Sequence, residues 1–209
     1  MPIGPGGLDA NGVWQYGEDD TEALASDLLN LGMASVSTEV GLLDAAVAAI
    51  TGGKILQVVS TTKTDTFTQS IASGAYTGDV TGLTAVITPA FTTSLILVSY
   101  SIVVVSQEDG AILSALYRNG SAIAIGAADG SRAQATAGTR SSSQANTVDT
   151  ISTQTLDAPS STSALTYSVR VGHVGVGTNI MYVNRSERDS NTYSDGRYTS
   201  TITAMEVAG

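Results

Sequence analysis

LYRNGSAIAIG, residues 116–126, is the stretch that most directly indicates the fold of this chain. Its Asn119-Gly120 dipeptide lies between two runs of strand-forming residues. This dipeptide is preferred in the two-residue type I′ turn, because both central residues of that turn take positive φ. The stretch therefore predicts a β-hairpin that turns at Asn119-Gly120.

Strand signals extend outward from this hairpin over residues 54–209. Runs rich in Val, Ile and Thr and bounded by turn residues are typical of strands. In residues 165–171, apolar and polar side chains alternate, which predicts one buried and one exposed face. Further strands are expected over residues 55–60, 62–68, 83–88, 95–106 and 199–207. Many short strands in one region predict a mainly β domain, a β-sandwich or jelly roll.

Residues 19–53 follow a helical pattern instead. Asp19 with Glu22 three residues later is a capping-box pattern, and a first short helix is expected to stop at Gly32. Ser35 or Ser37 can cap a second helix, which ends at Gly52-Gly53. Apolar residues recur at alternating spacings of four and three, as in the a/d seam of a coiled coil. The seam consists of Leu29, Met33, Val36, Val40, Leu43, Val47 and Ile50.

An isolated helix of this length is only marginally stable in water, so the seam needs a surface on which to pack. Two partners are open: the same helix in neighbouring subunits, or the β domain of the same chain. The seam indicates association but does not choose between two and three strands.

Residues 1–18 are rich in Gly yet contain the chain's only Trp. We interpret them as an extended arm that docks on a partner, with folding back onto the chain's own β domain as the alternative. The anchoring side chains would be Ile3, Leu8, Val13, Trp14 and Tyr16.

The formal charge of −10 is concentrated near the N-terminus, because residues 1–53 contain eight carboxylates and no Lys or Arg. The remainder is nearly balanced and offers no basic face, which argues against binding to nucleic acid. An acidic arm favours a basic or polar protein partner. The alternative is that these carboxylates only keep a helix in solution.

Several other classes of protein are disfavoured. The chain has no Cys, so disulfides and thiol chemistry are excluded. The N-terminus lacks the basic and apolar regions of a secretory signal. The most apolar run, residues 95–105, is too short and too interrupted by Ser and Tyr to cross a bilayer, so no membrane insertion is expected.

Catalysis finds little support in the sequence. His173 is the only histidine, and no G-x-S-x-G motif accompanies it. The stretch GHVGVG, residues 172–177, has the wrong glycine spacing for a dinucleotide-binding loop. We expect no enzymatic activity, no catalytic residue and no cofactor.

The densest acidic cluster of the β region lies in NRSERDSNTYSDGRY, residues 184–198. It lacks the EF-hand pattern, since Tyr193 stands where an oxygen ligand is required and Ser194 where Gly is required. Three arginines in the same stretch favour a loop held by ion pairs, so no metal is expected. A Ca²⁺ site and a glycosidase carboxylate pair are the alternatives.

A recognition surface, if present, is expected on loops at the distal end of the β domain. The candidates are a predicted long loop over residues 127–146 and the segment 189–198. In the second, the candidate residues are Asp189, Asn191, Tyr193, Asp195 and Tyr198. Exposed tyrosines beside polar groups are suited to stacking on sugars, although they also pack between subunits.

Several segments, in order, resemble the C-terminal heads of bacteriophage fibre and minor tail proteins. They are KILQVVSTTKTDTF, VTGLTAVITPAFTTSLILVSYSIVVVS, LYRNGSAIAIG, LDAPSSTSALTYSVR, MYVNRSERD and STITAMEVAG, within about three quarters of the chain. The front end, GVWQYGEDDTEALASDLLNLGMASVSTEV, resembles the virion-anchoring segment of small fibre-like proteins in phages of actinobacteria.

This resemblance implies a jelly-roll head, similar to tumour-necrosis-factor-like trimers, on a short three-helix stalk. The domains would be an arm over residues 1–18, a stalk over 19–53 and a head over 54–209. The chain would be a homotrimeric appendage on the surface of a phage virion, bound through its N-terminus to capsid, collar or tail proteins. The head could bind a host-surface glycan or protein, although about three heptads make a short shaft for that role. A capsid decoration protein and, from another class, a soluble carbohydrate-binding or capsule-degrading protein are the alternatives.

Overall fold

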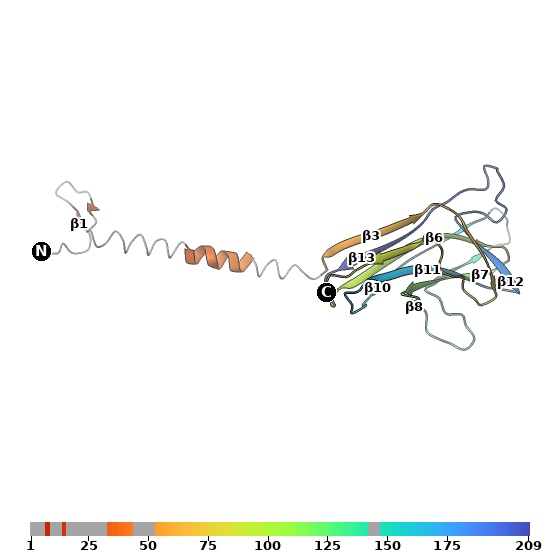
Figure 1. Ribbon diagram of the computed structural model, residues 1–209, viewed down its shortest axis with the longest axis horizontal. Helices are drawn as coiled ribbons and strands as arrows, with labels where there is room; N and C mark the ends of the chain where they lie inside the picture. Colours follow the sequence, from red (N-terminus) through yellow and green to blue (C-terminus); the bar gives the residue numbers. More distant parts are fainter. Residues whose placement is uncertain (1–6, 9–13, 16–32, 44–52, 142–146) are drawn as a thin grey trace. The chain divides into compact units, whose positions relative to one another are not determined.

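The computed structural model describes residues 7–8, 14–15, 33–43, 53–141 and 147–209. The chain forms two compact units, Met1–Thr51 and Gly52–Gly209. In the first, β1 (Gly7–Leu8) pairs antiparallel with β2 (Trp14–Gln15), and residues 33–43 are helical. The second unit consists mainly of strands, which confirms the prediction of a mainly β chain (Figure 1).

The first sheet of the second unit is built around one long central strand. Its strands are β3 (Ile55–Lys63), β4 (Phe67–Ala72), β6 (Leu95–Ser106), β10 (Asp149–Asp157), β12 (Thr178–Val183) and β13 (Ser200–Val207). β6 pairs with β10 along one edge and with both β12 and β13 along the other, so β12 and β13 form one interrupted line. β3 and β4 run beside them as a second interrupted line.

The second sheet has the order β5, β11, β7, with β8 and β9 both on the far edge of β7. Its strands are β5 (Thr84–Ile87), β7 (Gly110–Arg118), β8 (Ser121–Ile123), β9 (Ala137–Ser141) and β11 (Leu165–Val174). All of its pairings are antiparallel.

The two sheets enclose one hydrophobic core between them. Burial alternates along β13 and along residues 95–101 of β6, as expected for strands with one face against a core, whereas residues 102–106 of β6 are all buried. Side chains from both sheets are fully buried there, including Ile96, Ile102 and Ile202 from the first sheet and Ile112, Leu116, Tyr167 and Val169 from the second. Two antiparallel sheets packed in this way form a β-sandwich.

The hairpin predicted from LYRNGSAIAIG is present. β7 and β8 pair on either side of Asn119 and Gly120, whose φ angles are 49° and 80°. Positive φ at both central residues is the requirement that favours Asn-Gly in this turn. The strand predicted over residues 95–106 also has the predicted bounds.

Four local predictions are wrong. Ser35 and Ser37 lie inside the helix of residues 33–43 and do not cap its start. Residues 127–146 are not one loop, because residues 137–141 form β9 along the edge of β7 beyond the short β8. The first predicted strand pair divides at residues 64–66 rather than at 61. Ser168, predicted to be exposed, is buried. It lies opposite Tyr117 in the pairing of β11 with β7, and the Arg170 guanidinium stacks 3.9 Å from the centre of that tyrosine ring.

Candidate functional site

The segment 184–199 is an insertion in the middle of a strand line, between β12 and β13. Val183 lies opposite Val104 and Thr201 opposite Ser101 on the same edge of β6, so the chain leaves the sheet and returns almost to the point of departure. We call residues 184–199 the insertion loop. Such a loop projects from a rigid sheet rather than joining two sheet ends.

Buried hydrogen bonds fix the base of the insertion loop. The Asn184 side-chain amide donates to the carbonyl oxygens of Lys63 and Asp65, each at 3.0 Å. The Ser200 hydroxyl donates to Asn184 Oδ1 at 2.6 Å and accepts from the Val103 backbone N–H at 3.0 Å. Asn184 has a φ of 62°, a conformation that Asn adopts more readily than most residues. The polar residues at the two ends of the loop therefore stabilise each other.

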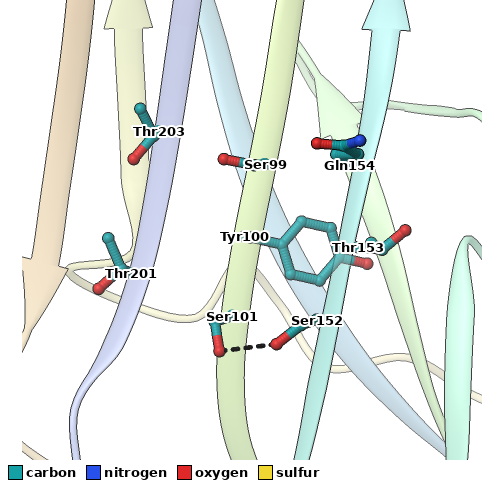
Figure 2. Close-up of a pocket in the computed structure, with 8 residues that line it drawn as sticks. All are labelled: Ser99, Tyr100, Ser101, Ser152, Thr153, Gln154, Thr201 and Thr203. Atoms are coloured by element: carbon teal, nitrogen blue, oxygen red, sulfur yellow. Dashed lines mark hydrogen bonds between the residues drawn. The ribbon is translucent and has the colours of Figure 1, made fainter.

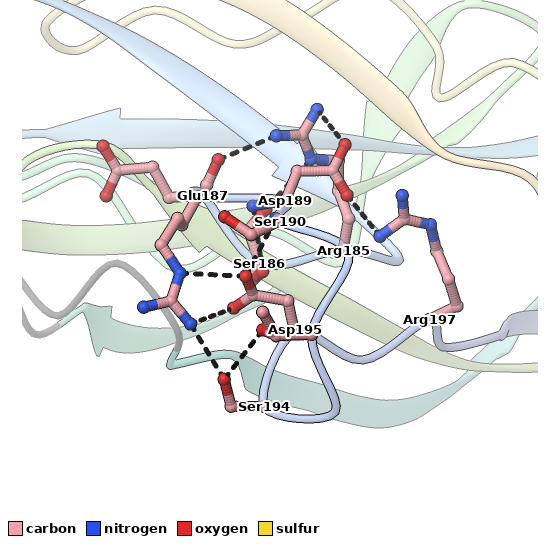
Figure 3. Close-up of polar contacts among 10 residues, drawn as sticks. Arg185, Ser186, Glu187, Asp189, Ser190, Ser194, Asp195 and Arg197 are labelled. Carbon is pink, nitrogen blue, oxygen red and sulfur yellow. Dashed lines mark hydrogen bonds and ion pairs between the residues drawn. The ribbon is translucent and has the colours of Figure 1, made fainter.

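Ion pairs hold the body of the insertion loop, as expected from its three arginines (Figure 3). Asp189 lies between Arg185, 3.1 Å away, and Arg197. The Arg188 guanidinium binds both carboxylate oxygens of Asp195, at 2.9 and 3.0 Å. Paired, bidentate contacts of this kind add geometric specificity as well as energy.

The contacts within the insertion loop lower the pKa of the Asp195 carboxyl group. The hydrogen bond from Arg188 is the main cause that lowers the pKa of Asp195 from 3.8 to about 2, and the Ser190 backbone N–H, which donates at 2.8 Å, acts in the same direction. The Asp195 side chain is buried, and desolvation opposes this shift without reversing it. Asp195 is therefore ionised at neutral pH, with its charge already compensated within the loop.

The structure divides the predicted recognition residues into two groups. Asp189 and Asp195 are occupied by arginines. Tyr198 is half-buried, and its backbone N–H donates to the Asn184 carbonyl at 3.2 Å. Asn191 and Tyr193 are exposed, and Tyr193 has a relative exposure of 105%. Only Asn191 and Tyr193 of the five are thus placed for contact with a partner.

The chemistry available at this loop is hydrogen bonding and aromatic stacking. Among residues 7–8, 14–15, 33–43, 53–141 and 147–209, no three His, Cys, Asp or Glu side chains are grouped so that they could hold a metal ion. His173, the single histidine, is fully buried at the end of β11, where the Asn179 side-chain amide lies 3.1 Å from its ring nitrogens. Its ring is thus separated from solvent.

The N-terminal predictions are described only in part. Leu8 and Trp14 are directly paired in β1 and β2, whereas Ile3, Val13 and Tyr16 lie outside the described residues. In the helix over residues 33–43, the four seam side chains are well exposed within the single chain: Met33 69%, Val36 60%, Val40 50% and Leu43 63%. The seam residues Leu29, Val47 and Ile50 lie outside the described residues.

One surface was not identified from the sequence. A shallow groove of about 460 Å³ lies on the outer face of the first sheet, and Figure 2 shows its hydroxyl side chains on neighbouring strands. The groove is lined by Ser99, Tyr100, Ser101, Ser152, Thr153, Gln154, Thr201 and Thr203. The signal was the placement of Ser99 and Ser101 at alternate positions in an otherwise apolar strand.

Comparisons with known proteins add little to this description. No protein-family model and no curated protein matches the chain. A solved structure with partial similarity is the "Structure of infectious bursal disease virus Gx strain", with a TM-score of 0.37 and 12% sequence identity. The match covers 76% of this chain and 38% of that chain. In the described part of this chain, no helix is long and apolar enough to cross a membrane.

Proposed function

We propose that this protein is a non-enzymatic, homotrimeric appendage on the surface of a phage virion. The arm attaches the chain to capsid, collar or tail proteins, the helical segment joins three copies, and the β-sandwich is the displayed head. The observation that carries the proposal is the exposed apolar seam on residues 33–43, in a unit that precedes a separate β-sandwich. Exposed apolar side chains at heptad positions are stabilised when copies of the helix associate.

The strand order supports a jelly-roll head. We count two strands that share an interrupted line as one line. The first sheet then has four neighbouring lines: β3 and β4 together, β13 and β12 together, then β6, and last β10. The second sheet has the order β5, β11, β7, β8 with β9. Along the chain, each connection between these lines crosses to the other sheet, except the β7–β8 connection, which stays in the second sheet. Eight strand lines in two antiparallel sheets with this order correspond to the double Greek key of a jelly roll.

Display of three heads on one stalk would act through multivalency. Three weak sites that engage one surface together reach an avidity far above the affinity of a single site. The insertion loop is the candidate contact, since ion pairs hold its backbone and Tyr193 is fully exposed. A host-surface glycan or protein is the proposed ligand of that loop.

Removal of residues 1–20 tests the attachment role. The truncated protein should keep the far-ultraviolet circular dichroism spectrum of a β protein, but it should no longer assemble onto particles that lack the full-length protein. Assembly of the truncated protein at the level of the full chain would show that the arm is not the anchor.

Two other functions remain as alternatives to be tested. A capsid decoration protein would join particles through the same arm, and particles without it would lose resistance to heat but keep host adsorption. A soluble carbohydrate-binding or capsule-degrading protein would bind or release sugar without particles. Sugar release by the purified chain would replace the proposed role.

A further inference from the structure

The outer face of the first sheet is organised in rows that cross its four strand lines. One row is apolar and contains Val58, Met205, Leu97 and Leu156, each opposite the next in the strand pairing. The next row contains Ser60, Thr203, Ser99 and Gln154. The third contains Thr62, Thr201, Ser101 and Ser152. We call these three rows the neutral face.

None of the side chains in the neutral face is charged. Its hydroxyls satisfy one another instead: Ser60 and Thr203 are 2.8 Å apart, and Ser152 donates to Ser101 at 2.9 Å (Figure 2). The outer face of the second sheet differs, because there Arg170 pairs with Asp79 at 2.7 Å and stacks on Tyr117. Depletion of charge is the compositional mark of the core of a protein interface.

The apolar row leaves large side chains in solvent. Val58 is 55% exposed and Leu156 is 57% exposed, and Ile55, which lies opposite Val207 at the start of β3, is 53% exposed. Both outer strand lines also present a sheet edge, and the exposed residues of β3 up to Thr62 include no charge to protect it. A contiguous apolar stripe beside an unprotected edge indicates a surface that another protein covers.

The position of the apolar row indicates which protein covers it. The row lies near the end of the sandwich where the chain begins the head, as Gly53 donates to the Ala208 carbonyl at 3.0 Å and Ala208 donates to the Lys54 carbonyl at 2.8 Å. Residues 44–52 link that end to the helix with the exposed seam. Copies joined through the seam would therefore tether their apolar rows by short segments, at a high effective concentration.

We propose that the neutral face is the surface on which the heads of other copies of this chain pack. This inference rests on the proposed homotrimer and assigns the part of the head that takes part in it. Other copies of the chain fit, because three neutral faces that turn toward a common three-fold axis bury no unpaired charge. A nucleic acid would require cations, and a glycan would require an exposed aromatic platform, whereas the three rows contain neither a cation nor an aromatic residue.

The size of the face predicts that it cooperates with the seam. Strands lie ~4.8 Å apart and alternate residues along a strand ~7 Å apart, so three rows across four lines cover roughly 400 Å² per copy. A standard specific interface buries about 800 Å² per partner. The neutral face is therefore too small to hold copies together by itself, and the seam supplies the remainder.

The test is to place a charge in the apolar row of the full chain, as Leu156→Glu and Val58→Glu. Both side chains are more than half exposed, so each variant should fold as the wild type does by circular dichroism. Val86→Glu is the matched control, since Val86 is a 53% exposed valine in β5 of the other sheet. The face variants should require at least about tenfold more protein to assemble, because burial of an unpaired charge costs more than the ~1.4 kcal/mol of a tenfold change. The control should assemble as the wild type does.

A cysteine provides a second readout that does not depend on destabilisation. The chain has no Cys, so Thr203→Cys places a single thiol at the centre of the neutral face. Mild oxidation should give disulfide-linked chains with Thr203→Cys at dilutions where Val176→Cys, on a turn and 91% exposed, gives none.

The possible failures are distinguishable. Wild-type assembly that neither glutamate variant weakens, with no link through Thr203→Cys, would overturn the neutral face and leave the homotrimer standing. A wild-type mass of one chain would overturn both the homotrimer and this inference. Loss of particle attachment on arm removal bears on the anchor alone.

Discussion

Tyr167→Phe tests how the two sheets are joined near the start of β6, where Asp157 lies opposite Ile96. The Tyr167 hydroxyl, on β11 of the second sheet, donates to Asp157 Oδ2 at 2.6 Å on β10 of the first. Arg118, on β7, binds the same carboxylate with two contacts of 2.8 and 2.7 Å. Burial and the hydrogen bond to Asp157 both raise the pKa of Tyr167, so the phenol keeps its proton and acts as the donor.

The magnitude follows from the charge of the acceptor. A hydrogen bond to a charged group contributes about 1.5–3 kcal/mol, and a neutral one about 0.5–1.5 kcal/mol. Tyr100→Phe is the matched control, because Tyr100 is also buried, and its hydroxyl lies 2.8 Å from the neutral Ser114 hydroxyl. Both substitutions remove one oxygen from a buried ring. We therefore expect Tyr167→Phe to cost about twice as much free energy of unfolding as Tyr100→Phe.

Urea unfolding followed by far-ultraviolet circular dichroism measures both costs at one protein concentration, so that association affects all samples alike. In thermal unfolding, the cost of Tyr167→Phe corresponds to a fall of roughly 3–12 °C, at ~2–4 °C per kcal/mol for a chain of this size. Equal costs for the two variants, or a cost below about 0.5 kcal/mol for Tyr167→Phe, would refute the assignment of a charged link between the sheets.

Three further predictions follow from other parts of the chain. Because the pKa of Asp195 is lowered from 3.8 to about 2, its ion pair stabilises the fold fully above about pH 4 and progressively less as the pH falls toward 2. In Asp195→Asn, the melting temperature should therefore fall less steeply between pH 4 and pH 2 than in the wild type, and an equal fall in both proteins would contradict this prediction. Gly110→Ala should lower the free energy of unfolding in urea by about 1–3 kcal/mol, because the new methyl would meet the His173 ring and lie 2.6 Å from the Val174 carbonyl oxygen. Wild-type stability of this variant would show that the neighbouring atoms move aside without cost. Val40→Asp with Val47→Asp should shift the mass in solution toward one chain, and an unchanged oligomer would mean that the seam packs elsewhere.

Local chemistry explains which parts of the fold were predictable. Asn119-Gly120 specifies its turn by backbone preference alone, and the apolar run within residues 95–106 predicts a buried strand without reference to its neighbours. Burial of Ser168 was not predictable, since it depends on Tyr117 from another strand and on Arg170 stacked above it. β9 was missed because its small residues form a strand only where the edge of β7 is free.

The candidate site was predictable in composition but not in arrangement. The arginines near Asp189 and Asp195 suggested ion pairs, and the structure contains them. The sequence did not indicate that residues 184–199 interrupt a strand line, because that follows from the pairing of both β12 and β13 with β6. The neutral face was missed for the same reason, since its rows join residues from β3, β6, β10 and β13.

The mass of the full-length protein in solution, measured by light scattering, tests the central claim most directly. A homotrimer joined by its helical seam predicts three times the chain mass of 21.2 kDa. A mass of one chain, at concentrations where the head is folded, would contradict the shared stalk and would mean that the exposed seam of residues 33–43 has a partner other than a copy of itself.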